Sequence, residues 1–218
     1  LIAQGVLWLP LVKKVSFVTP KLCLIIKHIK PNLVLFIPTI AVSIYKIMDK
    51  IMLGAIAGET EVGYYESCEK VIQVPMALIT ALGVVMLPYM ANFYSKDKND
   101  KSEAMILIRN SEHLMVILSS VIGFGIMAIA KEFVPVFYGK GYDKCIILFY
   151  ILLPSCIFLA FANVIRTQYL IPNKYDKEYI ASLIIGAVTN LFMNILLIPK
   201  LQSIGAAIGT LIAEMVVC

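Results

Sequence analysis

Charged residues are scarce in this chain. Asp, Glu, Lys and Arg make up 15% of the 218 residues, while 60% are hydrophobic and the mean hydropathy is +0.87. An average soluble domain carries about 25% charged residues. The scarcity excludes an ordinary soluble domain and indicates an all-α integral membrane protein, in which each spanning helix satisfies its own backbone groups.

Motifs of membrane enzymes and metal sites are also absent. The sequence has no HExxH, no aspartate-rich motif for diphosphate and metal, no glycine-rich phosphate loop and no GxSxG. Its five cysteines form no CxxC, and its two histidines are isolated. We therefore expect neither an enzyme nor a cofactor. The net charge of +5 reflects bases in loops and within spans, so no nucleic-acid partner is expected.

Six apolar segments are predicted to be spanning helices, for which about 20 residues are needed, and the sixth is expected to be truncated. They cover residues 32–54, 66–94, 111–130, 145–170, 179–198 and 204–218. Residues 1–31 are predicted to hold the end of a preceding span and a basic cytoplasmic connection. The chain starts without Met inside one apolar run and stops inside another, which predicts a fragment of a longer transporter.

Bases are divided unevenly between alternate loops, and this predicts the orientation. Eleven lie in one set of loops and four in the other. By the positive-inside rule the richer set is cytoplasmic. The richer set comprises 13–30, 96–109 and the loop with Lys174 and Lys177; the poorer set comprises 55–65, 131–144 and the turn with Lys200.

The first complete span carries Lys46, Asp49 and Lys50 within five residues. A charge at the centre of a membrane helix costs roughly 2.5 to 3.5 kcal/mol, so such residues rarely face lipid. One interpretation is that this polar stripe lines a cavity. The alternative is structural: Lys46 and Asp49, three residues apart, neutralise each other, and Lys50 extends to the interface.

Other spans carry polar residues as well. In the fourth span, Arg166 lies near the cytoplasmic boundary, where extending to the interface and lining a cavity are equally compatible with the sequence. The predicted cavity set has a net positive charge, which suits an anionic polar headgroup. It consists of Lys46, Asp49, Lys50, Glu69, Lys70, Gln73 and Arg166.

The last two spans are predicted to pack closely. Gly205 and Gly209 form a GxxxG motif, a weak signal by itself. Glu214 is deep in its span and is either paired or functional. The fifth span carries a stripe of small and amide residues, which favours helix packing over a ligand site: Ser182, Gly186, Thr189, Asn190 and Asn194.

Several stretches resemble the second half of bacterial polysaccharide flippases of the multidrug/oligosaccharidyl-lipid/polysaccharide transporter superfamily. They are YKIMDKIMLG, EVGYYESCEKVIQVP, LPYM, FYGKGY, RTQYLIPNKYDKEYI, NLFMNILLIP and GAAIGT. The resemblance implies a polytopic helical bundle in the bacterial cytoplasmic membrane, with two six-helix lobes and a central cavity open to each side in turn. This chain would be the second lobe.

The resemblance also implies a function. An undecaprenyl-diphosphate-linked oligosaccharide would be moved to the outer leaflet for surface polysaccharide assembly, coupled to a proton or sodium gradient. Membrane lipids, a polysaccharide polymerase and glycosyltransferases would be partners. Alternatives are a cation-coupled multidrug exporter, whose cavity should be acidic and aromatic; a membrane-embedded glycosyltransferase or polymerase, which needs a large polar catalytic loop; and a non-transporting scaffold, which needs no buried charges.

Overall fold

The computed structural model describes residues 29, 36, 43, 47–95 and 101–218. The chain divides into two units, Leu1–Ile37 and Pro38–Cys218, and every element below belongs to the second. Apart from Ile29, the predicted span end and basic connection in residues 1–31 lie outside the described residues. So do Lys46 and most of the first complete span.

The described residues form helices and no strands, which confirms the all-α prediction. Four of these stretches are long and apolar enough to cross a membrane: Glu59–Tyr94, Ser102–Phe137, Lys144–Leu170 and Asp176–Leu201. Residues 47–57 are the end of one helix. The others are α3 (Glu59–Ser95), α4 (Lys101–Phe137), α5 (Lys144–Leu152), α6 (Ser155–Ile165), the π-helical turn η1 (Arg166–Leu170), α7 (Asp176–Leu201) and α8 (Ser203–Val217).

Several helices extend further than the predicted spans. The predicted loop at 55–65 is wrong, because only Gly58, with φ +94°, separates helix 47–57 from α3. Similarly, α4 begins at Lys101 rather than near residue 111. Hydropathy marks only the part of a helix that lies in hydrocarbon, whereas acidic first turns, such as that of α3 with Glu59 and Glu61, stabilise helix starts outside it.

Proline affects these helices differently from one position to the next. The predicted span 145–170 contains Pro154, and in the structure a turn at this residue divides the span into α5 and α6. The predicted span 179–198 stops just before Pro199, whereas α7 continues through this proline to Leu201. Proline removes only one hydrogen bond of the ladder, and in α7 the backbone reverses three residues later, at Gln202 with φ 55°.

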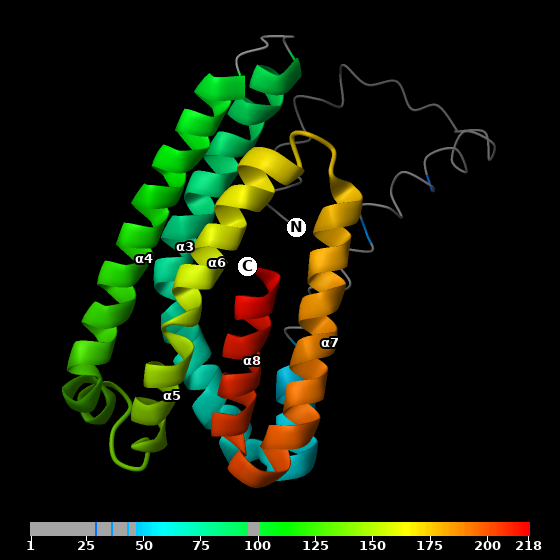
Figure 1. Cartoon of the computed structure of the whole chain (residues 1–218). Coiled ribbons are helices and arrows are strands. Elements are labelled where there is room, and N and C mark those ends of the chain that lie inside the picture. Colours follow the sequence, from blue (N-terminus) through cyan, green and yellow to red (C-terminus); the bar gives the residue numbers. More distant parts are fainter. Residues whose placement is uncertain (1–28, 30–35, 37–42, 44–46, 96–100) are drawn as a thin grey trace, which may run out of the picture. The chain divides into compact units, whose positions relative to one another are not determined.

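The helices pack around α8, which lies between α7 on one side and α5 and α6 on the other (Figure 1). One apolar core surrounds the lower half of α8 and includes Leu53, Phe149 and Ala206. A second core joins α3, α4 and α6, with Ile79 and Ile108 among its buried residues. The outer faces of α3, α4 and α7 carry exposed apolar side chains, as expected for surfaces in lipid.

The helix ends alternate as an antiparallel bundle requires. The start of α3, the start of α5 and the turn between α7 and α8 lie at one end, and the starts of α4 and α7 lie at the other (Figure 1). This grouping matches the predicted alternation of loops. Which end is cytoplasmic stays a prediction.

Cysteine labelling tests the orientation. Thr60 and Glu103 are exposed at opposite ends of the bundle. In a full-length protein freed of its native cysteines, we expect an impermeant thiol reagent to label Thr60→Cys in intact cells. Glu103→Cys should react only after permeabilisation, because the base-rich loops stay in the cytoplasm. The opposite pattern would reverse the assigned topology.

Candidate functional site

A buried polar cluster surrounds Asp49, and we call it the Asp49 cluster. Its members come from four elements that are distant in sequence: helix 47–57, α3, α7 and α8. Asp49 is only 3% exposed although it is acidic. The members are Asp49, Tyr65, Asn190, Asn194 and Thr210.

Neutral donors surround the carboxylate. The Nδ2 of Asn194 donates to Asp49 Oδ1 at 2.6 Å, and the Thr210 hydroxyl donates to Oδ2 at 2.9 Å. The Tyr65 hydroxyl is 3.1 Å from Oδ2 and 2.9 Å from Thr210 Oγ1. Asn194 also donates to Asn190 Oδ1 at 3.0 Å. Within the described residues, the hydrogen-bond partners of the buried carboxylate are thus uncharged, and they can orient it without cancelling its charge.

Glycines bring α7 and α8 close enough to build this cluster. A Cβ at Gly209 would lie 2.6 Å from the Oδ1 of Asn194, and one at Gly205 would lie 2.5 Å from the Leu197 carbonyl oxygen. At the far end of the pair, a Cβ on Gly186 would meet Val217. The close packing predicted from the GxxxG motif is therefore present. It places the amide of Asn194 directly against the backbone of α8.

The cluster has unused polar capacity. Among the described residues, Asn194 Oδ1 and Asn190 Nδ2 are buried without a hydrogen-bond partner. A buried polar atom without a partner costs about 1 to 3 kcal/mol, so a polar partner for these two amide atoms would stabilise the cluster. No three His, Cys, Asp or Glu side chains gather within the described ranges. A single carboxylate among neutral hydroxyl and amide groups matches one unit of positive charge better than a multivalent metal.

Two ion pairs lie on a neighbouring face formed by helix 47–57 and α3. Lys50 Nζ is 2.7 Å from Glu69 Oε2, and Lys70 Nζ is 3.3 Å from Glu66 Oε1. Gln73 is exposed on α3 one turn after Glu69. Charged side chains on spanning helices rarely face lipid, so this face is suited to a water-filled cavity or to contact with another part of the protein.

The predicted cavity residues are thus only partly gathered. Arg166 lies on η1, with its guanidinium 6.0 Å from the centre of the Tyr179 ring. Tyr179 and Asn190 are 11 residues apart on α7, or about 16 Å along the helix. The structure therefore separates Arg166 from the Asp49 cluster. Lys46 lies outside the described residues, and whether the predicted residues line a cavity stays a prediction.

Sequence reasoning did not assign Tyr65, Asn190, Asn194 and Thr210 to the site. The amide stripe with Asn190 and Asn194 predicts helix packing, and the predicted loop 55–65 includes Tyr65. Two amides spaced four residues apart on an apolar span are a usable signal, because each needs polar partners. The sequence does not say that those partners include Asp49. Glu214 is buried in α8.

A second polar group, the end clamp, joins α3, α5 and the turn before α8. Lys144 Nζ lies 2.7 Å from both carboxylate oxygens of Glu61 and donates to Gln202 Oε1 at 2.8 Å. The backbone N–H and the hydroxyl of Ser203 both donate to Glu61 Oε2. The clamp fixes the turn that carries α8 back into the bundle.

The end clamp should contribute measurably to stability. We expect Glu61→Gln to lower the free energy of unfolding by about 1 to 3 kcal/mol, because it removes the charge that Lys144 and Ser203 bind. Glu59→Gln, an exposed acid in the same first turn, is the matched control and should have little effect. Thermal unfolding of the purified full-length protein in detergent measures both variants. Equal unfolding temperatures would contradict a stabilising clamp.

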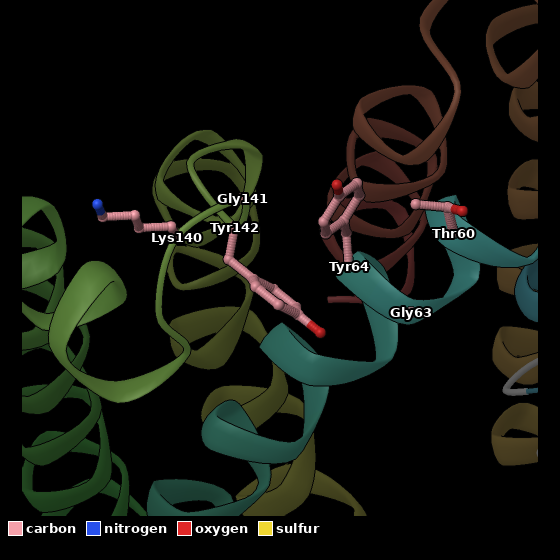
Figure 2. A pocket seen from close by; sticks show the side chains of 6 residues that line it. All are labelled: Thr60, Gly63, Tyr64, Lys140, Gly141 and Tyr142. Carbon is pink, nitrogen blue, oxygen red and sulfur yellow. The ribbon is translucent and has the colours of Figure 1, made fainter.

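A small pocket of about 210 Å³ lies beside the end clamp, between the start of α3 and the loop before α5 (Figure 2). Tyr64 and Tyr142 meet edge to face with ring centres 5.5 Å apart, and the Lys140 side chain points away from them. Nearby, burial raises the pKa of the Tyr138 hydroxyl, which donates to the Ser67 carbonyl at 2.7 Å. The pocket is lined by Thr60, Gly63, Tyr64, Lys140, Gly141 and Tyr142.

A bundle of apolar spanning helices with a buried carboxylate and a charged face is characteristic of membrane transport proteins. Comparison with known families is more specific. Residues 8–147 match the family described as polysaccharide biosynthesis protein. This is more than half of the chain, and the chain belongs to this family.

Three relatives support this assignment. The chain is 26% identical over 182 residues to a candidate O-antigen transporter of Escherichia coli K12, covering 84% of this chain and 43% of the relative. It is 23% identical over 172 residues to a candidate low-salt glycan biosynthesis flippase, Agl15, of Haloferax volcanii, covering 76% and 34%. It is 26% identical over 155 residues to a candidate lipid II flippase, MurJ, of Rickettsia prowazekii, covering 66% and 29%.

These matches confirm the resemblance to polysaccharide flippases. They also agree with a multi-pass location in the cell membrane and with a protein that is not an enzyme, since the relatives are named for transport. The chain spans less than half the length of each of these relatives. No solved structure matches it significantly.

Proposed function

We propose that this chain forms part of a flippase that moves a lipid-linked oligosaccharide across the cytoplasmic membrane during surface polysaccharide assembly. Membership of the polysaccharide biosynthesis family is the observation that carries this proposal. The names of the three relatives support it, because each refers to the transport or flipping of a glycan or glycan-bearing molecule. They favour a flippase over a multidrug exporter or a non-transporting scaffold.

The charged face supports an anionic, polar substrate such as an undecaprenyl-diphosphate-linked repeat unit. Lysine ammonium groups bind phosphate oxygens through charge-assisted hydrogen bonds, which are about twice as strong as neutral ones. Lys50 and Lys70 are the described bases on this face. A polysaccharide polymerase and glycosyltransferases would supply or consume the lipid-linked chain as partners.

The Asp49 cluster supports coupling to a proton or sodium gradient. Among the residues that the structure describes, its single carboxylate is buried with neutral hydrogen-bond partners, so uptake of one cation would relieve the cost of burying this charge in a low-dielectric interior. The cluster joins helix 47–57 to α3, α7 and α8. Cation binding and release can therefore change how these helices pack, which is what coupling to an alternating-access transition requires.

Gene deletion tests the function. In a strain lacking the full-length gene, we expect lipid-linked oligosaccharide to accumulate in the cytoplasmic leaflet and surface polysaccharide to fall. Plasmid-borne wild-type protein should restore both. Unchanged polysaccharide with increased drug sensitivity would indicate an exporter. Lower polysaccharide without accumulation in the inner leaflet would indicate a scaffold.

A further inference from the structure

The Lys50–Glu69 pair occupies an unusual position between the buried cluster and the exposed charged face. The two side chains are 30% and 25% exposed, so the pair is neither sealed in the core nor free in solvent. The Lys50 Nζ lies 2.7 Å from Glu69 Oε2, which is the distance of a charge-assisted hydrogen bond. Because both side chains are partly exposed, an anion that reaches the charged face can compete with Glu69 for the Lys50 ammonium.

The Asp49 cluster fixes this pair in place. Lys50 directly follows Asp49, and Glu69 lies one turn after Tyr65 on α3. The hydrogen bond between Tyr65 and Asp49, 3.1 Å long, sets the alignment of the two helices from the buried side. Glu69 is consequently held opposite Lys50 in the folded protein.

We propose that Glu69 is a specificity-determining residue, an internal anion that occupies Lys50 until a more highly charged substrate group displaces it. The inference rests on the proposed function, in which that group is the diphosphate of a lipid-linked sugar. Attraction to Lys50 grows with the charge of the competing anion. A singly charged anion at Lys50 would replace the charge of Glu69 with an equal one and leave Glu69 without its partner, so it gains little. A diphosphate carries more negative charge and more acceptor oxygens than the Glu69 carboxylate, so it can displace Glu69.

The Glu66–Lys70 pair on the same helix provides an internal comparison. Lys70 and Glu66 are 69% and 41% exposed, and their charged atoms are 3.3 Å apart. Exposed ion pairs contribute little because water and salt screen them. Glu66 should therefore restrain Lys70 far less than Glu69 restrains Lys50, and its removal should leave anion selectivity nearly unchanged.

Anion binding to the purified full-length protein tests the proposal, with inorganic diphosphate and singly charged dimethyl phosphate as probes. We expect Glu69→Gln to bind diphosphate about tenfold more tightly than wild type, because Glu69 no longer competes for Lys50. A tenfold change in affinity corresponds to about 1.4 kcal/mol. It should also bind dimethyl phosphate, which the wild type excludes. Glu66→Gln should change neither affinity more than about threefold, as expected for an exposed pair.

Two further variants keep the test decisive. Adding Lys50→Gln to Glu69→Gln should abolish the gain, because the freed ammonium is gone. Glu69→Asp, which keeps the charge but shortens its reach, should show a smaller gain and serves if Glu69→Gln does not fold. Wild-type binding with no gain in either Glu69 variant would overturn the inference and leave the proposed function intact. Absence of diphosphate binding in every protein would overturn both the inference and diphosphate recognition.

Discussion

Asp49→Asn is expected to remove the dependence of flipping on an ion gradient. Asparagine has nearly the size of aspartate and can keep most contacts of the Asp49 cluster, so the protein should still fold and insert. Asparagine carries no charge, so the cluster no longer attracts a cation. Coupling between two binding sites typically changes the affinity of one site 5- to 150-fold. We expect the rate of gradient-driven flipping to fall about 100-fold.

The measurement is flipping of a fluorescent lipid-linked oligosaccharide in proteoliposomes containing the full-length protein, with an imposed proton or sodium gradient. The gradient that accelerates the wild-type protein identifies the coupling ion. Asp143→Asn is the matched control, because Asp143 is exposed and makes no side-chain hydrogen bond at the start of α5. If Asp49→Asn responds to the gradient as the wild type does, the Asp49 cluster is not the coupling site.

Gly205→Ala should have the largest effect on stability. Its new Cβ would lie 2.5 Å from the Leu197 carbonyl oxygen and 2.9 Å from the Ile198 nitrogen, which are backbone atoms that no side-chain rotation can move. The helices α7 and α8 would have to separate. Overpacking of this kind costs about 1 to 3 kcal/mol, and more where the backbone must shift.

Thermal unfolding of the purified full-length protein measures this cost. Gly125→Ala is the control, because a Cβ there meets nothing within 4 Å and alanine favours a helix. Separation of α7 from α8 should also pull Asn194 away from Thr210. Gly205→Ala should therefore weaken gradient dependence in the flipping assay as well. An unfolding temperature equal to that of the wild type would show that this close approach is not required.

The helical architecture could be predicted because a membrane imposes a strong local rule. An apolar run of sufficient length satisfies its backbone only as a helix, so the spans containing Glu69, Gln73 and Arg166 were located without any tertiary information. Helix ends were predicted less well. The first turn of α3 and the last turn of α7 lie beyond the apolar runs, where capping and packing decide whether the helix continues.

The sequence by itself determined that the chain is a helical membrane protein with charges inside its spans, because hydropathy and charge are properties of each residue. Only the tertiary structure decided which groups meet. Asn194 and Thr210 lie 145 and 161 residues from Asp49, and Lys50 pairs with Glu69 across two helices. A hydrogen bond depends on atomic separations of about 3 Å, and those separations are set by how α7 and α8 pack at Gly205 and Gly209, which no local pattern specifies.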